Sequence, residues 1–170
     1  MLVIFGGLPA VGKTTLSRAL AERLGAVYLR IDTIETAIAH SDLHAGETNA
    51  GYLAAYGIAK DNLCMRHTVV ADSVNAIRVT RDAWREVARA AGVASVEIEV
   101  ICSDISEHQR RVENRIADIE GHKLPTWQAI AARKYEAWES KNITIDTATQ
   151  TPAEALEAIL DLLSRTGGSL

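Results

Sequence analysis

The chain is poor in cysteine and aromatic residues and has no excess of positive charge. Its two cysteines, Cys64 and Cys102, lie far apart without a CxxC motif, which disfavours a disulfide framework and predicts reduced, structural thiols. A net charge of −4 and a pI of about 5.7 disfavour a general nucleic-acid binder, although a local basic groove stays possible. No run of ~18 apolar residues occurs, so we expect no membrane span.

The rest of the composition is that of one globular domain. With 170 residues, 48% of them hydrophobic, the chain can bury a sizeable core, so we expect a single domain over residues 1–170. Neither a charged n-region nor a cleavage site precedes the first apolar run at Leu2, so we expect no signal peptide and a cytoplasmic location. The composition does not distinguish a monomer from a homodimer.

Short apolar runs alternate with amphipathic stretches along the chain. Apolar runs are typical of strands covered on both faces, and the stretches between them show helical spacing. The pattern predicts strands at residues 2–5, 26–31, 67–71, 94–102 and 143–146. It predicts helices at residues 14–24, 34–39, 49–66, 78–91, 104–117, 125–138 and 152–163, and a polar loop at 40–47. We therefore predict the α/β class: a three-layer α/β/α sandwich with a five-stranded parallel sheet.

A glycine-rich stretch, GLPAVGKT, joins the first predicted strand to the first predicted helix. It fits the pattern G-x-x-x-x-G-K-[ST] in the strand–loop–helix context that a phosphate-binding loop requires. The glycines allow backbone angles closed to other residues, so that successive N–H groups form an anion-binding hollow. Lys13 would reach the terminal phosphates, and the Thr14 hydroxyl would ligate Mg²⁺. The predicted phosphate-binding residues are Gly7, Leu8, Pro9, Ala10, Val11, Gly12, Lys13, Thr14 and Thr15.

The stretch FGGLPAVGKTTLSRALAERLGA resembles the P-loop kinases that phosphorylate small molecules or nucleic-acid ends. That group includes the chloramphenicol phosphotransferases, zeta-toxin kinases, gluconate and shikimate kinases, and polynucleotide 5′-kinases. The similarity continues in YLRIDTIE, HTVVADSVN, QRRVENR and ITIDTA, and so spans nearly the whole chain. It implies a P-loop NTPase fold with a helical, arginine-bearing lid at about residues 108–126. It also implies ATP and Mg²⁺ as cofactors, and a small hydroxylated acceptor such as a sugar, nucleoside or antibiotic.

Asp32 follows the second predicted strand, where sheets of this type carry their ligand sites. In the resembling kinases an aspartate in this place accepts the proton of the acceptor hydroxyl, so the resemblance implies that Asp32 is the base. The alternative is a plain N-cap, with Asp32 or Thr33 capping the next helix. Glu35 stands where the polynucleotide-kinase branch has an arginine that meets an acceptor phosphate. A carboxylate there would repel that phosphate and suits an amine or a polyol.

Asp72 closes the third predicted strand, HTVVA. It has the look of a Walker-B aspartate, which would hold Mg²⁺ together with Thr14. The letters DSVN resemble the DATN of the polynucleotide-kinase-like branch, which implies that Ser73 and Asn75 face the acceptor. The alternative for Ser73 and Asn75 is an ordinary turn at a strand end.

The charged stretch HQRRVENRIADIEGHKL supplies candidate cations. Arg111 and Arg115 are four residues apart, on one face of the helix predicted at 104–117. Lid arginines stabilise the transferred phosphoryl group in the resembling kinases, which implies this catalytic role for both, together with Lys13. The alternative is a solvated helix whose charges pair with one another. The letters DIEG at 118–121 fit the GTPase pattern D-x-x-G, but they follow no strand, and we interpret the match as chance.

Three functions stay open at this point. The first is an ATP-dependent kinase of a small hydroxylated acceptor, and the second is a polynucleotide 5′-hydroxyl or nucleotide kinase, which would need a basic groove beside Asp32. The third is an ATP-binding regulator without phosphotransfer. Asp146 and Thr147 either line the adenine pocket, as the resemblance implies, or form an ordinary strand end. Metal binding by His40 and His44 is disfavoured, because HSDLHAG lacks the glutamate of a zinc protease.

Overall fold

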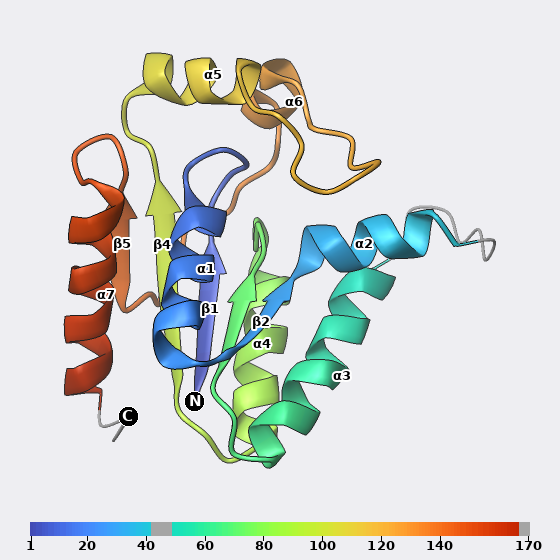
Figure 1. Ribbon diagram of the computed structural model, residues 1–170, viewed down its shortest axis with the longest axis vertical. Coiled ribbons are helices and arrows are strands. Elements are labelled where there is room, and N and C mark those ends of the chain that lie inside the picture. Colours follow the sequence, from blue (N-terminus) through green and yellow to red (C-terminus); the bar gives the residue numbers. More distant parts are fainter. Residues whose placement is uncertain (42–48, 167–170) are drawn as a thin grey trace.

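The computed structural model describes residues 1–41 and 49–166, which fold around a parallel β-sheet (Figure 1). The strands are β1 (Leu2–Gly6), β2 (Val27–Arg30), β3 (Val69–Asp72), β4 (Ser95–Ile101) and β5 (Ile143–Asp146). They form one five-stranded sheet in the order β2-β3-β1-β4-β5, with every pairing parallel, which confirms the predicted α/β sheet. Most of the loop expected at 40–47, and His44 with it, lies outside the described residues.

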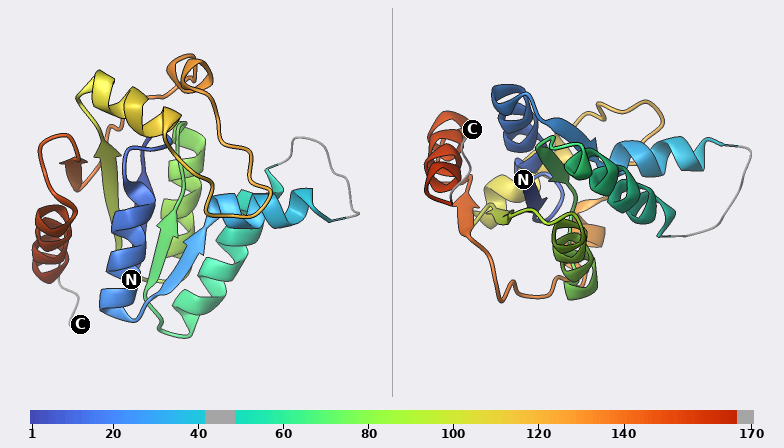
Figure 2. Two further views of the ribbon diagram at one scale, coloured as in Figure 1. Left: turned by 45° about the horizontal axis from the view of Figure 1, so that its top comes forward. Right: turned by 90° about the horizontal axis from the view of Figure 1, so that it is seen from below.

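Helices cover both faces of the sheet and give the predicted three layers (Figure 2). They are α1 (Lys13–Leu24), α2 (Ile31–Ala39), α3 (Ala50–Cys64), α4 (Arg78–Ala90), α5 (Ile105–Glu113), α6 (Trp127–Ala131) and α7 (Pro152–Arg165). Side chains alternate across each strand, so one core forms against α1 and α7, around Phe5, Leu20 and Ile159. The other forms against α3 and α4, around Ile4 and Trp84. Within the described residues, no helix combines the length and apolarity needed to cross a membrane.

The candidate site lies where the central strand of the sheet, β1, ends. All five residues of β1 are buried, and β1 pairs with β3 on one side and β4 on the other. The chain that leaves its carboxyl end therefore emerges in the middle of the sheet edge, between the ends of β3 and β4. Helices α5 and α6 lie across this same edge, above the strand ends (Figure 1).

The start of α2 differs from the prediction. The helix begins at Ile31, directly after β2, with Arg30 as its N-cap and no side-chain capping bond. The expectation that Asp32 or Thr33 caps this helix is therefore wrong. Asp32 lies in the first turn instead, where the positive end of the helix dipole favours a carboxylate.

The charged helix is shorter than predicted. Helix α5 ends at Glu113, with Asn114 as its C-cap. The backbone N–H and the side-chain amide of Asn114 both donate to the carbonyl oxygen of Arg110, at 3.1 and 2.7 Å, and close the last turn. Arg115 consequently lies beyond the helix, and the prediction that Arg111 and Arg115 share one helical face is wrong.

Helix α6 is also shorter than predicted, with Ala131 as its last residue. The following chain is held by another partner, because the guanidinium of Arg81 donates to the carbonyl oxygens of Glu136 and Ala137, each at 3.0 Å. Tertiary hydrogen bonds thus replace the helical ones, which local sequence cannot reveal. Trp138, expected at the end of this helix, packs buried against Arg81 instead.

Candidate active site

The phosphate loop connects β1 to α1 and needs its glycines. Gly7 has φ +138°, and a Cβ there would lie 2.1 Å from the carbonyl oxygen of Val100, so the position accepts only glycine. Gly12, at φ +97°, precedes α1 without a side-chain cap on the first N–H groups of the helix. These groups and the positive end of the helix dipole can therefore both act on a bound anion.

Lys13 is buried inside the loop that it follows. Its Nζ donates a hydrogen bond to the carbonyl oxygen of Leu8 at 2.9 Å. Burial lowers the pKa of Lys13, whereas the nearby carboxylates of Asp72 and Asp32 raise it. The ammonium group thus lies among the groups predicted to meet phosphate, metal and acceptor.

Asp72 ends β3 and lines the same cavity as Thr14. Its buried carboxylate accepts the O–H of Tyr28 at 2.8 Å. Burial and the charge of Asp72 raise the pKa of Tyr28, so the phenol stays a hydrogen-bond donor. A hydroxyl with a carboxylate suits Mg²⁺, which keeps several waters and is bound through one or two carboxylates plus phosphate oxygens. The pair Thr14 and Asp72 therefore fits the predicted metal.

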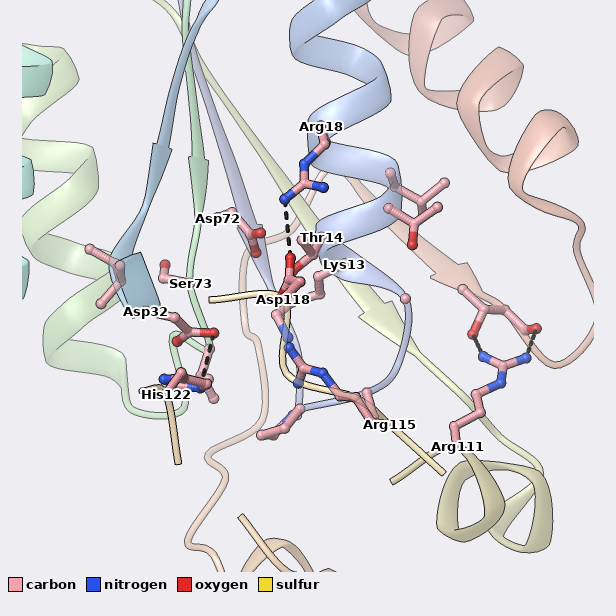
Figure 3. Close-up of a pocket in the computed structure, with 18 of the residues that line it drawn as sticks. Lys13, Thr14, Arg18, Asp32, Asp72, Ser73, Arg111, Arg115, Asp118 and His122 are labelled. Carbon is pink, nitrogen blue, oxygen red and sulfur yellow. Dashed lines mark hydrogen bonds and ion pairs between the residues drawn. The ribbon is translucent and has the colours of Figure 1, made fainter. Parts of the chain in front are cut away.

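A cavity of about 1010 Å³ joins the phosphate loop to α2 and to the predicted lid, residues 108–126. Pockets for a small molecule measure roughly 300–1,000 Å³, so this cavity has room for a nucleotide and a second, small ligand. Asp32 lies in its wall with a side chain 32% exposed. Its Oδ2 is 3.9 Å from Nη2 of Arg30 and 4.0 Å from Nε2 of His122, and Figure 3 shows the Asp32 and His122 side chains side by side.

Glu35 lies one turn after Asp32 and lines the same cavity. Burial raises the pKa of Glu35, and the charge of Asp32 raises it further. On its other side Glu35 packs against α3, because a Cβ on Gly51 would lie 2.3 Å from Cγ of Glu35. A molecule bound at this end of the cavity therefore meets two carboxyl groups.

Ser73 and Asn75, both predicted to face the acceptor, are placed differently. Ser73 is buried at the cavity wall, and its Oγ has no hydrogen-bond partner within the described residues. An unpaired buried hydroxyl costs about 1–3 kcal/mol, which a ligand's hydrogen bond can recover. Asn75 is completely buried, and its Nδ2 donates to the carbonyl oxygen of Phe5 at 2.9 Å. The structure thus brings Ser73 to the cavity wall, while Asn75 braces the end of β1.

The two predicted lid arginines reach different places (Figure 3). Arg115 lines the cavity close enough to Lys13 for its charge to lower the pKa of Lys13. Arg111 lines the same cavity, but its Nη1 and Nη2 donate to Oγ1 and the carbonyl oxygen of Thr147, at 2.7 and 2.9 Å. Its Nε donates to Glu107 at 2.7 Å. The structure therefore brings both arginines to the cavity, with the Arg111 guanidinium bound to Thr147 and Arg115 near Lys13.

The two residues considered for the adenine pocket also differ. Thr147 lines the cavity, and its Oγ1 donates to the carbonyl oxygen of Val11 in the phosphate loop at 2.8 Å. The carboxylate of Asp146 instead accepts the backbone N–H groups of Ser103 and Ala148, both at 3.0 Å. Thr147 is thus the member of the pair that lines the cavity.

Sequence reasoning missed an ion pair between β2 and the lid. The Arg30 side chain is 4% exposed, and its Nη1 and Nη2 donate to Oδ2 and Oδ1 of Asp118 at 2.7 and 2.9 Å. Arg18 of α1 adds a hydrogen bond to Oδ2 of Asp118 at 3.2 Å. The signal for this pair was an arginine in the otherwise apolar run AVYLRI, because a buried arginine requires partners. Asp118 gives no corresponding local signal.

Sequence reasoning also missed two lid histidines. The buried His108 lies 2.8 Å through Nε2 from the carbonyl oxygen of Pro9, so α5 contacts the phosphate loop directly. Trp127 packs edge-on against the His108 ring at 5.2 Å between centroids. His122, the second histidine, reaches α2 and lines the cavity beside Asp32, where the acceptor is predicted to bind.

Comparisons with known proteins agree with this fold. A family model described as "AAA domain" matches residues 2–165. No curated protein matches the chain. A gluconokinase from Sinorhizobium meliloti is similar at TM-score 0.65 and 21% identity, over 96% of this chain and 91% of that one. The Mycobacterium tuberculosis APS kinase CysC, in complex with AMPPNP and APS, gives 0.65 and 17% over 96% of both chains. Chaetomium thermophilum Kti12 in complex with ADP-AlF3 gives 0.73 and 20% over 99% and 100%. Identities this low show a shared fold alone.

Proposed function

Because the chain belongs to the AAA domain family and has a P-loop kinase-like fold, we propose that it is an ATP-dependent kinase. It transfers the γ-phosphate of ATP to a hydroxyl of a small-molecule acceptor, such as a sugar, a nucleoside or an antibiotic-like compound. One observation carries the proposal: Asp32 and the phosphate loop line a single cavity with room for a donor and an acceptor. The free thiols of Cys64 and Cys102 fit the reducing cytoplasm, where we place the enzyme.

The donor half of the site binds ATP. Backbone N–H groups of the phosphate loop hold the β- and γ-phosphates, and Lys13 contributes its positive charge to them. Thr14 and Asp72 would hold Mg²⁺, which neutralises phosphate charge when bound. Thr147 and the lid lie beside the loop, where the nucleoside extends from the phosphates.

The acceptor half of the site uses Asp32 as the base. The carboxylate orients the acceptor hydroxyl toward the γ-phosphorus and takes its proton as the new bond forms, which needs geometry more than an unusual basicity. Glu35 and the unpaired Ser73 hydroxyl supply further hydrogen-bonding groups for a polyol or an amine. Neither suits an acceptor phosphate as an arginine would.

Two cations stabilise the charge on the transferred group in this proposal, namely Lys13 and Arg115. Both line the cavity at the phosphate loop, and fixed cations there act without reorganisation during the reaction. Arg111 was expected to join them. Its hydrogen bonds to Thr147 give it a bracing role in our proposal, in which it holds the loop after β5 against the phosphate loop.

The proposal is tested by measuring phosphate transfer from radiolabelled ATP in the presence of Mg²⁺. The acceptor panel contains sugars, nucleosides, aminoglycosides and a 5′-hydroxyl oligonucleotide. We expect at least one small hydroxylated compound to be phosphorylated faster than ATP is hydrolysed without it. Labelling of the oligonucleotide alone would favour the polynucleotide-kinase alternative. ATP binding without transfer to any acceptor would favour the ATP-binding regulator.

A further inference from the structure

His122 projects from the lid into the acceptor end of the cavity (Figure 3). Its Nδ1 lies 3.0 Å from Oγ1 of Thr36, and its Nε2 lies 4.0 Å from Oδ2 of Asp32. Thr36 and Asp32 are four residues apart on α2 and so share one face of that helix. One imidazole ring therefore spans from the predicted base to the next turn of the same helix.

The surroundings of the ring determine which nitrogen carries the proton in the neutral imidazole. A proton on Nδ1 would leave the Nε2 lone pair directed at the Asp32 carboxylate, and the two would repel. A proton on Nε2 is attracted by that carboxylate, and Nδ1 then accepts the O–H of the buried Thr36. Thr36 and Asp32 together thus select an Nε2–H group that faces the base.

Two further contacts hold this part of the lid on the β2–α2 segment. Asp118 makes its paired hydrogen bonds to the buried guanidinium of Arg30. Next to His122, Gly121 packs against His40 at the end of α2, since a Cβ on Gly121 would lie 2.1 Å from Cε1 of His40. His122 therefore directly follows two anchored points of the lid.

The gap between Nε2 and Oδ2 has the size of one oxygen atom. A direct N–H···O hydrogen bond measures about 2.7–3.2 Å, so the 4.0 Å separation is too long for one. Two atoms at this separation can each lie about 2.8 Å from a common oxygen, which then accepts from one and donates to the other. An alcohol oxygen can do both and still keep a lone pair for attack.

We propose that His122 and Asp32 form the seat of the acceptor hydroxyl, with His122 as an acceptor-binding residue supplied by the lid. The inference rests on the proposed kinase function. Nε2–H donates to the acceptor oxygen, and the acceptor O–H donates to Asp32. As the oxygen bonds to the γ-phosphorus of ATP, the bond from that phosphorus to the bridging oxygen breaks and leaves its electron pair on ADP. The hydroxyl proton passes to Asp32, and His122 keeps its own.

The test compares His122→Ala, His122→Gln and the control His40→Ala, using the panel acceptor that the wild type phosphorylates fastest. We expect His122→Ala to lower kcat/KM for that acceptor by about 100-fold, because a positioning hydrogen bond is lost. His122→Gln keeps an N–H donor at a similar distance, so its kcat/KM should be at least about tenfold higher than that of His122→Ala. The affinity for ATP should change less than about twofold in every variant. His40→Ala should lower kcat/KM by less than about threefold, because it loses a packing contact with the lid but no group that faces Asp32.

Several results would contradict the proposal that His122 and Asp32 bind the acceptor hydroxyl. Wild-type kcat/KM in His122→Ala would do so, as would equal losses in His122→Ala and His40→Ala, which indicate lid packing alone. Either result leaves the kinase proposal standing, whereas a wild type that phosphorylates no panel acceptor removes both. Long-range ¹H–¹⁵N spectra of the wild type give a readout that does not depend on activity or on any variant's folding. We expect the His122 proton on Nε2, and a neutral ring with its proton on Nδ1 would contradict the seat.

Discussion

Asp32 is useful to this site because of where α2 begins. The side chain of a residue that caps a helix accepts hydrogen bonds from backbone N–H groups of the first turn. Asp32 instead lies within the first turn, and its carboxylate faces the cavity. The helix dipole supports its negative charge there, and Lys13 and Arg30 add positive charge nearby. Because α2 begins about one turn earlier than predicted, the Asp32 side chain does not cap the helix and is available as the proposed base.

Replacing Asp32 with asparagine tests this role at constant shape. Asp32→Asn should lower kcat for phosphate transfer by at least about 100-fold, since an amide cannot take the hydroxyl proton. ATP affinity, measured by titration calorimetry, should change little because the phosphate loop is untouched. Asp161→Asn makes the same chemical change on the exposed side of α7 and should leave kcat unaltered. If Asp32→Asn transfers phosphate at the wild-type rate, Asp32 is not the base.

Ser73 offers a second residue-level test, because its hydroxyl is buried and unpaired within the described residues. Ser73→Ala removes a polar group that gains no hydrogen bond from the fold, so the Tm should stay the same or rise. The KM for the acceptor should increase about 3–10-fold, the value of one neutral hydrogen bond. A lower Tm with an unchanged KM would instead identify a structural hydroxyl.

At the scale of elements, the lid is held by contacts between distant parts of the sequence. Residues 88 positions apart form the Arg30–Asp118 pair, and α5 reaches the phosphate loop through His108. These contacts bring charges and hydrogen-bonding groups over the cavity without adding a continuous helix. The geometry of the lid therefore depends on a few polar contacts, and each contact can be tested by mutating one of its residues.

Asp118→Asn should loosen the lid selectively. The amide oxygen can accept only one of the two guanidinium N–H groups, because the second carboxylate oxygen becomes an NH₂ donor. Leaving the other buried donor unsatisfied costs about 1–3 kcal/mol. Hydrogen exchange at residues 114–126 should speed up several-fold, while exchange in β1 and α7 stays unchanged. Glu86→Gln breaks the exposed Arg89–Glu86 pair on α4 and serves as the matched control, with no expected change in the lid. Unchanged exchange at 114–126 in Asp118→Asn would show that Asp118 does not hold the lid.

The same pair makes part of the stability depend on pH. Hydrogen bonds from Arg30 lower the pKa of Asp118 far below its ordinary value of about 4. Because the pKa of Asp118 is lower in the folded than in the unfolded protein, its ionised carboxylate contributes its full stabilisation at pH values above the unfolded-state pKa. This contribution is lost as the pH falls from the unfolded-state pKa through the folded-state pKa. The Tm difference between wild type and Asp118→Asn should therefore be constant from about pH 8 to 5 and shrink toward pH 3. A difference that grows in acid would contradict the assignment.

The sequence predicts strands and helices well where the signal is local. The five strands lie in short, mainly apolar runs, and α7 begins at a Thr151–Glu154 capping box that can be recognised from four letters. The prediction fails at the ends of α5 and α6, which coincide with side-chain hydrogen bonds of Asn114 and Arg81. The candidate site divides in the same way. The phosphate loop is a contiguous motif, whereas the placement of His122 depends on tertiary contacts that no pattern along the chain encodes.

At the scale of the whole molecule, one sheet edge collects every group that the proposed reaction uses. Strands β1, β2 and β3 end side by side, and they deliver the phosphate loop, Asp32 and Asp72 to the same edge, which the lid then covers (Figure 1). The two apolar cores lie on either side of the sheet, and most of their residues are away from this edge, with Val11 and Ile31 reaching it. Ligands can therefore bind at the edge without disturbing the layers that stabilise the fold.

This arrangement predicts that nucleotide binding stabilises the whole fold, because the phosphates bridge β1, α1 and the lid. ATP with Mg²⁺ at a hundred times its Kd should add about 2.7 kcal/mol to the free energy of unfolding. For a domain of this length that corresponds to a Tm increase of roughly 5–11 °C in a thermal-shift assay. Lys13→Ala removes the buried ammonium at the loop and should abolish most of the shift at the same ATP concentration, while Lys60→Ala on α3 should keep it. An equal shift in Lys13→Ala would show that the nucleotide binds elsewhere, since any ligand held by the phosphate loop must meet this side chain.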